Sequence, residues 1–149
     1  MVTLRPMRRA LFAGAMVALL FGAVPVSADT GGGGPAPFQL SIDPTGTVTR
    51  LGLATIGGTI NCDGADSVVF LDLNVGLTQP VGRLHAVQGN GYLPGLTCTP
   101  GSVLAFSIPI IPFNGKFSQG FATAGGDAFG CDDLTCGESQ VTTAVTLKR

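Results

Sequence analysis

Short runs of apolar and β-branched residues, separated by glycine, proline and asparagine, fill the chain after residue 38. The clearest run is 67–75, in which apolar side chains at 69, 71, 73 and 75 alternate with Phe70, Asp72 and Asn74. A period of two is that of a strand with one buried face, and a helix cannot satisfy it. We therefore expect Phe70, Asp72 and Asn74 to lie on the exposed face of a sheet.

Eight other runs also have the composition of strands: 39–43, 45–50, 54–62, 82–88, 103–110, 116–123, 128–131 and 141–147. Turn signals stand at Asn90-Gly91 and Asn114-Gly115, and Gly57-Gly58 suggests a bulge. No stretch of 11 or more residues has the apolar spacing of a helix. The pattern predicts an all-β domain, an immunoglobulin-like antiparallel β-sandwich of seven to nine strands.

The first 28 residues have the pattern of a secretory signal peptide. Three arginines precede an uncharged apolar run at 10–24, and Val26 and Ala28 suit a cleavage site. The run is shorter than the about 20 residues of a spanning helix, so we expect a secreted protein with no membrane insertion after signal removal. Residues 29–38 are rich in glycine and proline and predict a disordered linker, which leaves 39–149 as the folded domain.

Charge is sparse: 11% of the 149 residues are charged, and the net charge is −1. Loss of the signal peptide removes three arginines and no acid, which leaves five basic and nine acidic residues. A mildly acidic domain whose lysines and arginines are spread singly along the chain does not suit nucleic acid. We expect a protein or small-molecule partner, which the sequence does not identify.

The four cysteines form an even set in an exported chain, which favours two disulfides over thiol chemistry. Three pairings are possible. We favour Cys62 with Cys98 and Cys131 with Cys136, because the second pair closes a short loop and the first would staple one edge of the sandwich. A metal site at the late loop is the alternative, but zinc sites usually need more cysteine or histidine, and His85 is the single histidine.

The late loop, Gly130-Cys131-x₄-Cys136, resembles that of the neocarzinostatin-type apoproteins, as do the signal peptide and the low-charge chain rich in threonine, valine and glycine. Those small secreted actinobacterial proteins hold an enediyne antibiotic in a cleft. The chain also resembles a wider group of secreted actinobacterial immunoglobulin-like domains, through Gly46-Thr47-Val48 and Cys62 after a Thr-rich strand. The resemblance implies the sandwich and the Cys131–Cys136 bond. It supplies no ligand residues, because the chain lacks tryptophan and its first cysteine pair spans a long loop.

Catalytic signals are weak. His85 stands alone, no G-x-S-x-G motif occurs, and two disulfides would leave no free thiolate. We therefore expect no catalytic residue, cofactor or metal. Calcium is an open alternative, because carboxylates gather around the late hairpin and extracellular sites can be weak. These carboxylates belong to Asp127, Asp132, Asp133 and Glu138.

An exposed Phe70 beside Asp72 and Asn74 would make a surface for a ligand or partner, whereas most other aromatic residues should fill the core. The resulting hypothesis is a non-catalytic, secreted binding or surface-associated domain. A carrier with an apolar cleft is a second hypothesis. A hydrolase, in which His85 would pair with an acid, is a third.

Overall fold

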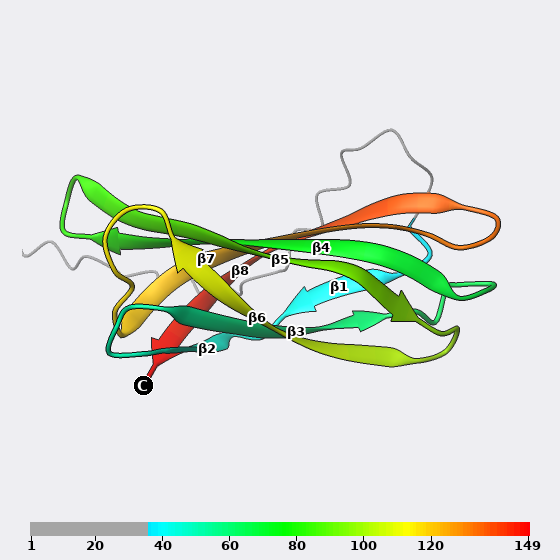
Figure 1. Ribbon diagram of the computed structural model, residues 1–149, viewed down its shortest axis with the longest axis horizontal. Coiled ribbons are helices and arrows are strands. Elements are labelled where there is room, and N and C mark those ends of the chain that lie inside the picture. Colours follow the sequence, from blue (N-terminus) through cyan, green and yellow to red (C-terminus); the bar gives the residue numbers. More distant parts are fainter. Residues whose placement is uncertain (1–35) are drawn as a thin grey trace, which may run out of the picture.

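The computed structural model describes residues 36–149, and they form eight strands. The predicted signal peptide, 1–28, and residues 29–35 of the predicted linker lie outside this part. The strands are β1 (Gln39–Ile42), β2 (Thr45–Val48), β3 (Ala54–Asn61), β4 (Val69–Val81), β5 (His85–Cys98), β6 (Val103–Pro112), β7 (Gly120–Cys131) and β8 (Cys136–Lys148) (Figure 1). In the described residues there is no helix with the length and apolarity needed to cross a membrane.

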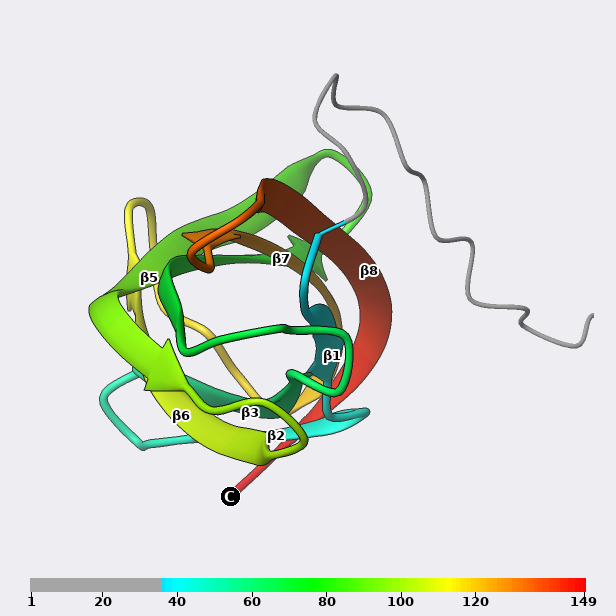
Figure 2. The same cartoon turned by 90° about the vertical axis from the view of Figure 1, so that its right-hand side faces the viewer.

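The strands form one sheet in the order β1-β3-β2-β8-β7-β4-β5-β6, and β6 pairs back to β3. Seven strands thereby close into a ring, which Figure 2 shows end-on. All pairings are antiparallel except that of β2 with β8. The expected all-β class is confirmed. We expected two separate layers, whereas here the layers are joined into a closed barrel by β2–β8 at one side and by a short β5–β6 pairing at the other.

The first strand is split by Pro44, which has no N–H to offer a sheet. Before this proline, β1 pairs with the second half of β3. After it, β2 pairs with the start of β3 and, in parallel, with the end of β8. After the proline, β2 thus joins β3 of one layer to β8 of the other.

Three features of the expected strand pattern differ from the observed strands. The run at 67–75 continues to Val81, and the chain turns at Gly82, whose φ is 68°. The Asn90-Gly91 turn was wrong, because both residues pair within β5, with Gly76 and Val75 of β4. The runs at 116–123 and 128–131 are replaced by the single strand β7, and the Asn114-Gly115 turn is confirmed, with a φ of 81° at Gly115.

The predicted bulge at Gly57-Gly58 was also wrong. Both glycines pair with β6 in unbroken register, opposite Ser107 and Phe106. The irregularity lies instead between Leu71 and Leu73, in the pairing of β4 with β5. The glycines serve close packing, because a β-carbon at position 58 would overlap the carbonyl of Ser41 and the ring of Phe106.

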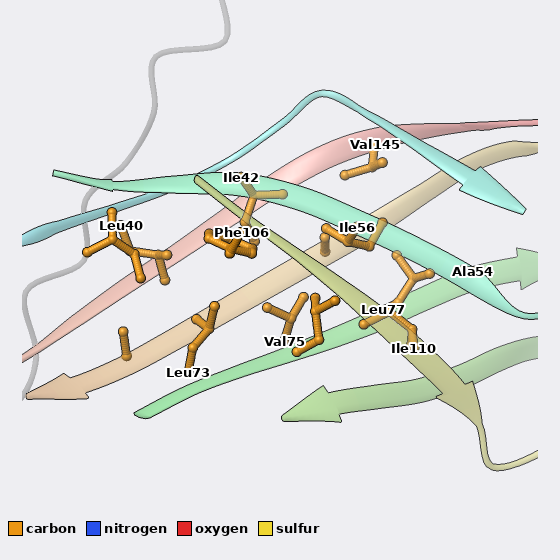
Figure 3. Close-up of a cluster of buried hydrophobic side chains, with 14 of the residues drawn as sticks. Leu40, Ile42, Ala54, Ile56, Leu73, Val75, Leu77, Phe106, Ile110 and Val145 are labelled. Atoms are coloured by element: carbon orange, nitrogen blue, oxygen red, sulfur yellow. The ribbon is translucent and has the colours of Figure 1, made fainter. Parts of the chain in front are cut away.

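The inward side chains of the strands form one hydrophobic cluster. Figure 3 shows Leu73, Val75 and Leu77 of β4 across from Ile56 of β3 and Ile110 of β6. Burial of such side chains is the main favourable term in folding. Phe38, which the sequence placed at the end of the linker, is 3% exposed and belongs to this core.

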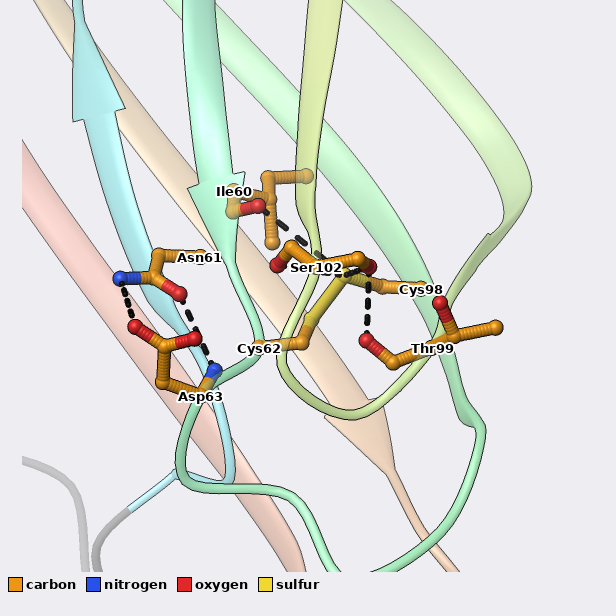
Figure 4. The surroundings of a disulfide bond; sticks show 7 residues. All are labelled: Ile60, Asn61, Cys62, Asp63, Cys98, Thr99 and Ser102. Carbon is orange, nitrogen blue, oxygen red and sulfur yellow. Dashed lines mark hydrogen bonds between the residues drawn. A yellow bond between two sulfur atoms is a disulfide. The ribbon is translucent and has the colours of Figure 1, made fainter.

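Both predicted disulfides are present. Cys62 follows β3 and Cys98 ends β5, and both are buried where β5 and β6 separate (Figure 4). Cys131 and Cys136 close the hairpin between β7 and β8. The first bond therefore links the end of β3 to the end of β5, two strands that do not pair with each other.

Candidate functional site

The predicted surface residues Phe70, Asp72 and Asn74 point outward from β4. Their neighbours Leu71 and Leu73 point into the core, because successive side chains alternate between the faces of a strand. Phe70 is 63% exposed. The structure thus places all three residues on the outer surface.

Neighbouring strands enlarge this surface. On β7, Phe129 lies opposite Asp72, and Asp127 lies opposite Asn74. On β5, Tyr92 lies opposite Asn74 on the other side. Residues that face each other across a pair of strands are close enough for their side chains to touch.

The next strand adds one more carboxylate. Glu138 of β8 lies opposite Phe129, and its Oε1 accepts a hydrogen bond from Nε2 of Gln140. We call the whole group the aromatic–acidic face, and it consists of Phe70, Asp72, Asn74, Tyr92, Asp127, Phe129 and Glu138.

Sequence reasoning did not find Tyr92, Phe129, Asp127 or Glu138 as members of one face. The sequence predicts only that most aromatic residues other than Phe70 fill the core, and Tyr92 stands just after the wrongly expected turn. The alternation of Ala128, Phe129 and Gly130 was the available signal, since the two small residues face inward.

The face is electronegative at neutral pH, and its carboxylates influence one another. Burial, reinforced by the nearby carboxylate of Glu138, raises the pKa of Asp127. A hydrogen bond with Asp72 is the main cause that raises the pKa of Tyr92. Oδ1 of Asp72 also accepts a hydrogen bond of 2.7 Å from the backbone N–H of Gly95. The face thus presents aromatic rings among hydrogen-bond acceptors.

Of the acids considered for calcium, Asp132 has structural partners in its own loop and in a neighbouring one. Oδ1 of Asp132 accepts hydrogen bonds from the backbone N–H groups of Leu134 and Thr135 at 2.9 and 2.6 Å. Its Oδ2 accepts another from the N–H of Asp66 at 3.3 Å. These bonds lower the pKa of Asp132, the Thr135 bond most.

Residues 36–149 contain no group of three or more histidine, cysteine, aspartate or glutamate side chains placed to hold a metal ion. Asp133, the other acid of this loop, is exposed. Asp63 binds the side chain of Asn61 at 2.9 Å (Figure 4). The carboxylates of Asp63 and Asp132 therefore organise the loops in which they lie.

The remaining candidates lie apart from the face. His85 is exposed at the first position of β5, beside the β4–β5 turn, whereas Asp72 and Glu138 lie near the other end of the domain, close to the β7–β8 turn. A hollow of about 220 Å³ lies between the start of β1 and the end of β3. Its wall includes Asn61 and Asp63, and its one aromatic residue is Phe38.

No known family model matches the chain. No curated protein matches it either. Among solved structures it is similar to the crystal structure of Spo0M, a sporulation control protein from Bacillus subtilis, with a TM-score of 0.34 and 10% sequence identity. The similarity covers 78% of this chain and 50% of that protein, so the chain spans about half of its length.

Proposed function

We propose that this protein is a secreted, non-catalytic immunoglobulin-like domain that binds a ligand through its aromatic–acidic face. The exposure of Phe70, Tyr92 and Phe129 among three carboxylates on one surface carries this proposal. Large exposed aromatic groups are costly in water unless a partner covers them, and clustered ones mark interaction sites.

The strand order supports the immunoglobulin-like assignment. β1, β3 and β6 pair as one layer, and β8, β7, β4 and β5 pair as the other. The edge strand split at Pro44 serves both layers, and β2 runs parallel to the last strand. The two disulfides suit an oxidising, extracellular location.

The chemistry of the face limits its ligand. Carboxylates accept hydrogen bonds and attract positive charge, and flat aromatic rings stack on apolar or cationic groups. A suitable ligand therefore offers hydrogen-bond donors or cationic groups next to flat apolar surface, as a polysaccharide or a basic peptide does. Three of the five exposed aromatic residues lie on this open face and not in a cleft, which does not favour an antibiotic carrier. His85 lies away from the carboxylates of the face, which does not favour a hydrolase.

Calorimetric titration with chitohexaose and with a lysine-rich peptide tests the proposal. We expect one probe to bind and the double variant Phe70→Ala/Phe129→Ala to weaken its binding at least about tenfold. Phe121→Ala is the matched control, because Phe121 is also an exposed aromatic residue of β7 but lies at its other end. Binding that the double variant leaves intact, or failure of both probes to bind, contradicts the proposal.

A further inference from the structure

The lysines and arginines, which are scattered in the sequence, gather at one end of the folded domain. Antiparallel strands return alternate loops to the same end of a sheet. Arg50 lies between β2 and β3, Arg83 between β4 and β5, and Lys116 between β6 and β7, while Lys148 and Arg149 close β8. These segments all lie at the left of Figure 1. They contain every lysine and arginine of residues 36–149, and we call this the basic end.

Contacts join the loop of Arg50 to the loop of Lys116 and to the end of β8. The backbone N–H of Phe117 donates to the carbonyl of Gly52 at 3.2 Å. Gly52 also packs directly on Lys116, since a β-carbon added at 52 would strike the Lys116 side chain. Lys148 pairs with Thr47 of β2, just before the Arg50 loop.

Seven of the eight acidic residues of 36–149 lie at or near the opposite end, and the eighth, Asp43, lies between β1 and β2, beside Gly57 of β3. The loops at the opposite end carry Asp63, Asp66, Asp132 and Asp133. Asp72, Asp127 and Glu138 lie on the parts of β4, β7 and β8 nearest to those loops. Positive and negative charges are thus separated along the length of the domain, although its net charge is small.

Each basic loop also carries a large apolar side chain that faces water. Leu51 follows Arg50 and is 74% exposed, and Leu84 follows Arg83 and is 90% exposed. Phe113 shares its loop with Lys116 and is 68% exposed. Three separate loops therefore combine one cationic and one apolar side chain each.

We propose that the basic end docks on the surface of an anionic lipid bilayer. Leu51, Leu84 and Phe113 would enter the region of the headgroups, while the basic side chains contact lipid phosphates. Apolar burial and attraction to anionic lipid add together at such interfaces. A bilayer accepts apolar groups from separate loops, whereas a protein partner would need a matching pocket for each.

The same surface repels the acidic end, so the long axis of the domain stands roughly perpendicular to the bilayer, with the acidic end farthest from it. The aromatic–acidic face, near the far end, stays accessible in this orientation. The docking does not depend on what that face binds.

Vesicle co-sedimentation of the secreted protein tests the proposal. We expect binding to vesicles of equal parts phosphatidylglycerol and phosphatidylcholine, and at least about tenfold weaker binding to phosphatidylcholine alone. An increase from 50 to 500 mM NaCl should weaken binding at least about tenfold, because salt screens the attraction. Equal binding to both kinds of vesicle overturns the proposal.

Two pairs of variants separate the apolar and the ionic contributions. Leu84→Ser should weaken binding about fivefold or more. Leu134 is 75% exposed at the acidic end, so Leu134→Ser is the control and should leave binding unchanged. Arg83→Gln/Lys116→Gln should weaken it at least about tenfold, and Asp133→Asn should not. Thermal unfolding of each variant verifies that it is folded. A loss that is the same for Leu84→Ser and Leu134→Ser contradicts the proposal.

Two other partners give different results. If the end binds soluble polyanions, heparin will bind and Leu84→Ser will bind heparin and vesicles as the parent does. If it binds the acidic end of a second copy, sedimentation velocity without lipid will show oligomers at low salt that Arg83→Gln/Lys116→Gln abolishes. Either result in place of lipid-dependent binding overturns the docking proposal.

Discussion

Gln79 of β4 and Ser118 of the β6–β7 loop form a reciprocal pair of hydrogen bonds. Nε2 of Gln79 donates to the carbonyl of Ser118 at 2.8 Å, and Oε1 accepts from the backbone N–H of Ser118 at 2.8 Å. Gln79 is buried. One side chain therefore satisfies both backbone groups of a loop residue and anchors the loop that carries Phe113 and Lys116.

Replacing Gln79 by alanine should destabilise the protein by about 2 kcal/mol, because it removes two hydrogen bonds to the backbone of Ser118, each worth about 1 kcal/mol. Urea unfolding measures this change. Gln88→Ala is the control, since Gln88 is an exposed residue of β5. A similar loss of unfolding free energy in both variants would show that the hydrogen bonds between Gln79 and Ser118 do not stabilise the protein.

Two strand glycines should respond oppositely to alanine. At Gly58 a β-carbon would lie 2.5 Å from Cζ of Phe106 and would also overlap the carbonyl of Ser41. Gly58→Ala should therefore cost about 1–3 kcal/mol through overpacking. At Gly125 of β7 nothing lies within 4 Å of the added atom.

Gly125→Ala should be neutral or stabilise by up to about 1 kcal/mol, because glycine loses more backbone freedom on folding than alanine does. Differential scanning calorimetry of both variants gives the two signs. The prediction fails if Gly58→Ala melts at or above the parent temperature.

Alternation within one strand made part of the face predictable. The inward side chains of β4 are apolar at every second position, so Phe70 and Asp72 had to point outward. Strand pairing is not local, and it decided the rest. Tyr92 and Phe129 join the face because β5 and β7 flank β4, a relationship that no periodicity encodes.

The non-local nature of strand pairing also explains two wrong predictions and one unpredicted feature, the basic end. Asn90-Gly91 has the composition of a turn, but β4 and β5 are long enough to pair past it. Gly57-Gly58 has the composition of a bulge, but the glycines instead permit close approach of β1 and Phe106. The single basic residues become a cluster only after the topology brings alternate loops together.

The two disulfides should differ in their contribution to stability. In the chain-entropy account the bond across 36 residues contributes about 4 kcal/mol and the bond across 5 residues about 2 kcal/mol. We expect Cys62→Ala/Cys98→Ala to lower the unfolding free energy about twice as much as Cys131→Ser/Cys136→Ser. Guanidinium unfolding of the two double variants measures the ratio, and a larger loss at the hairpin bond would contradict it.

Asp127 should make the stability of the protein depend on pH. Burial and Glu138 raise its pKa above the ordinary value of 3.8, so the folded state binds this proton more tightly than the unfolded state does. The stabilisation is complete below pH 3.8 and is lost as the pH rises through the folded-state pKa. At pH 7 the charged side chain therefore opposes folding, and solvent weakens this effect because the group is largely exposed.

Asp127→Asn should accordingly raise the melting temperature at pH 7, and the gain should vanish below pH 3.8, where the parent side chain is protonated. Glu138→Gln should produce part of the same gain, because it removes the neighbouring charge that opposes ionisation of Asp127. Combining the two changes should add less than the sum of the single effects. Asp133→Asn is the control for loss of one negative charge, and an equal gain from that variant would assign the effect to net charge rather than to the Asp127–Glu138 pair.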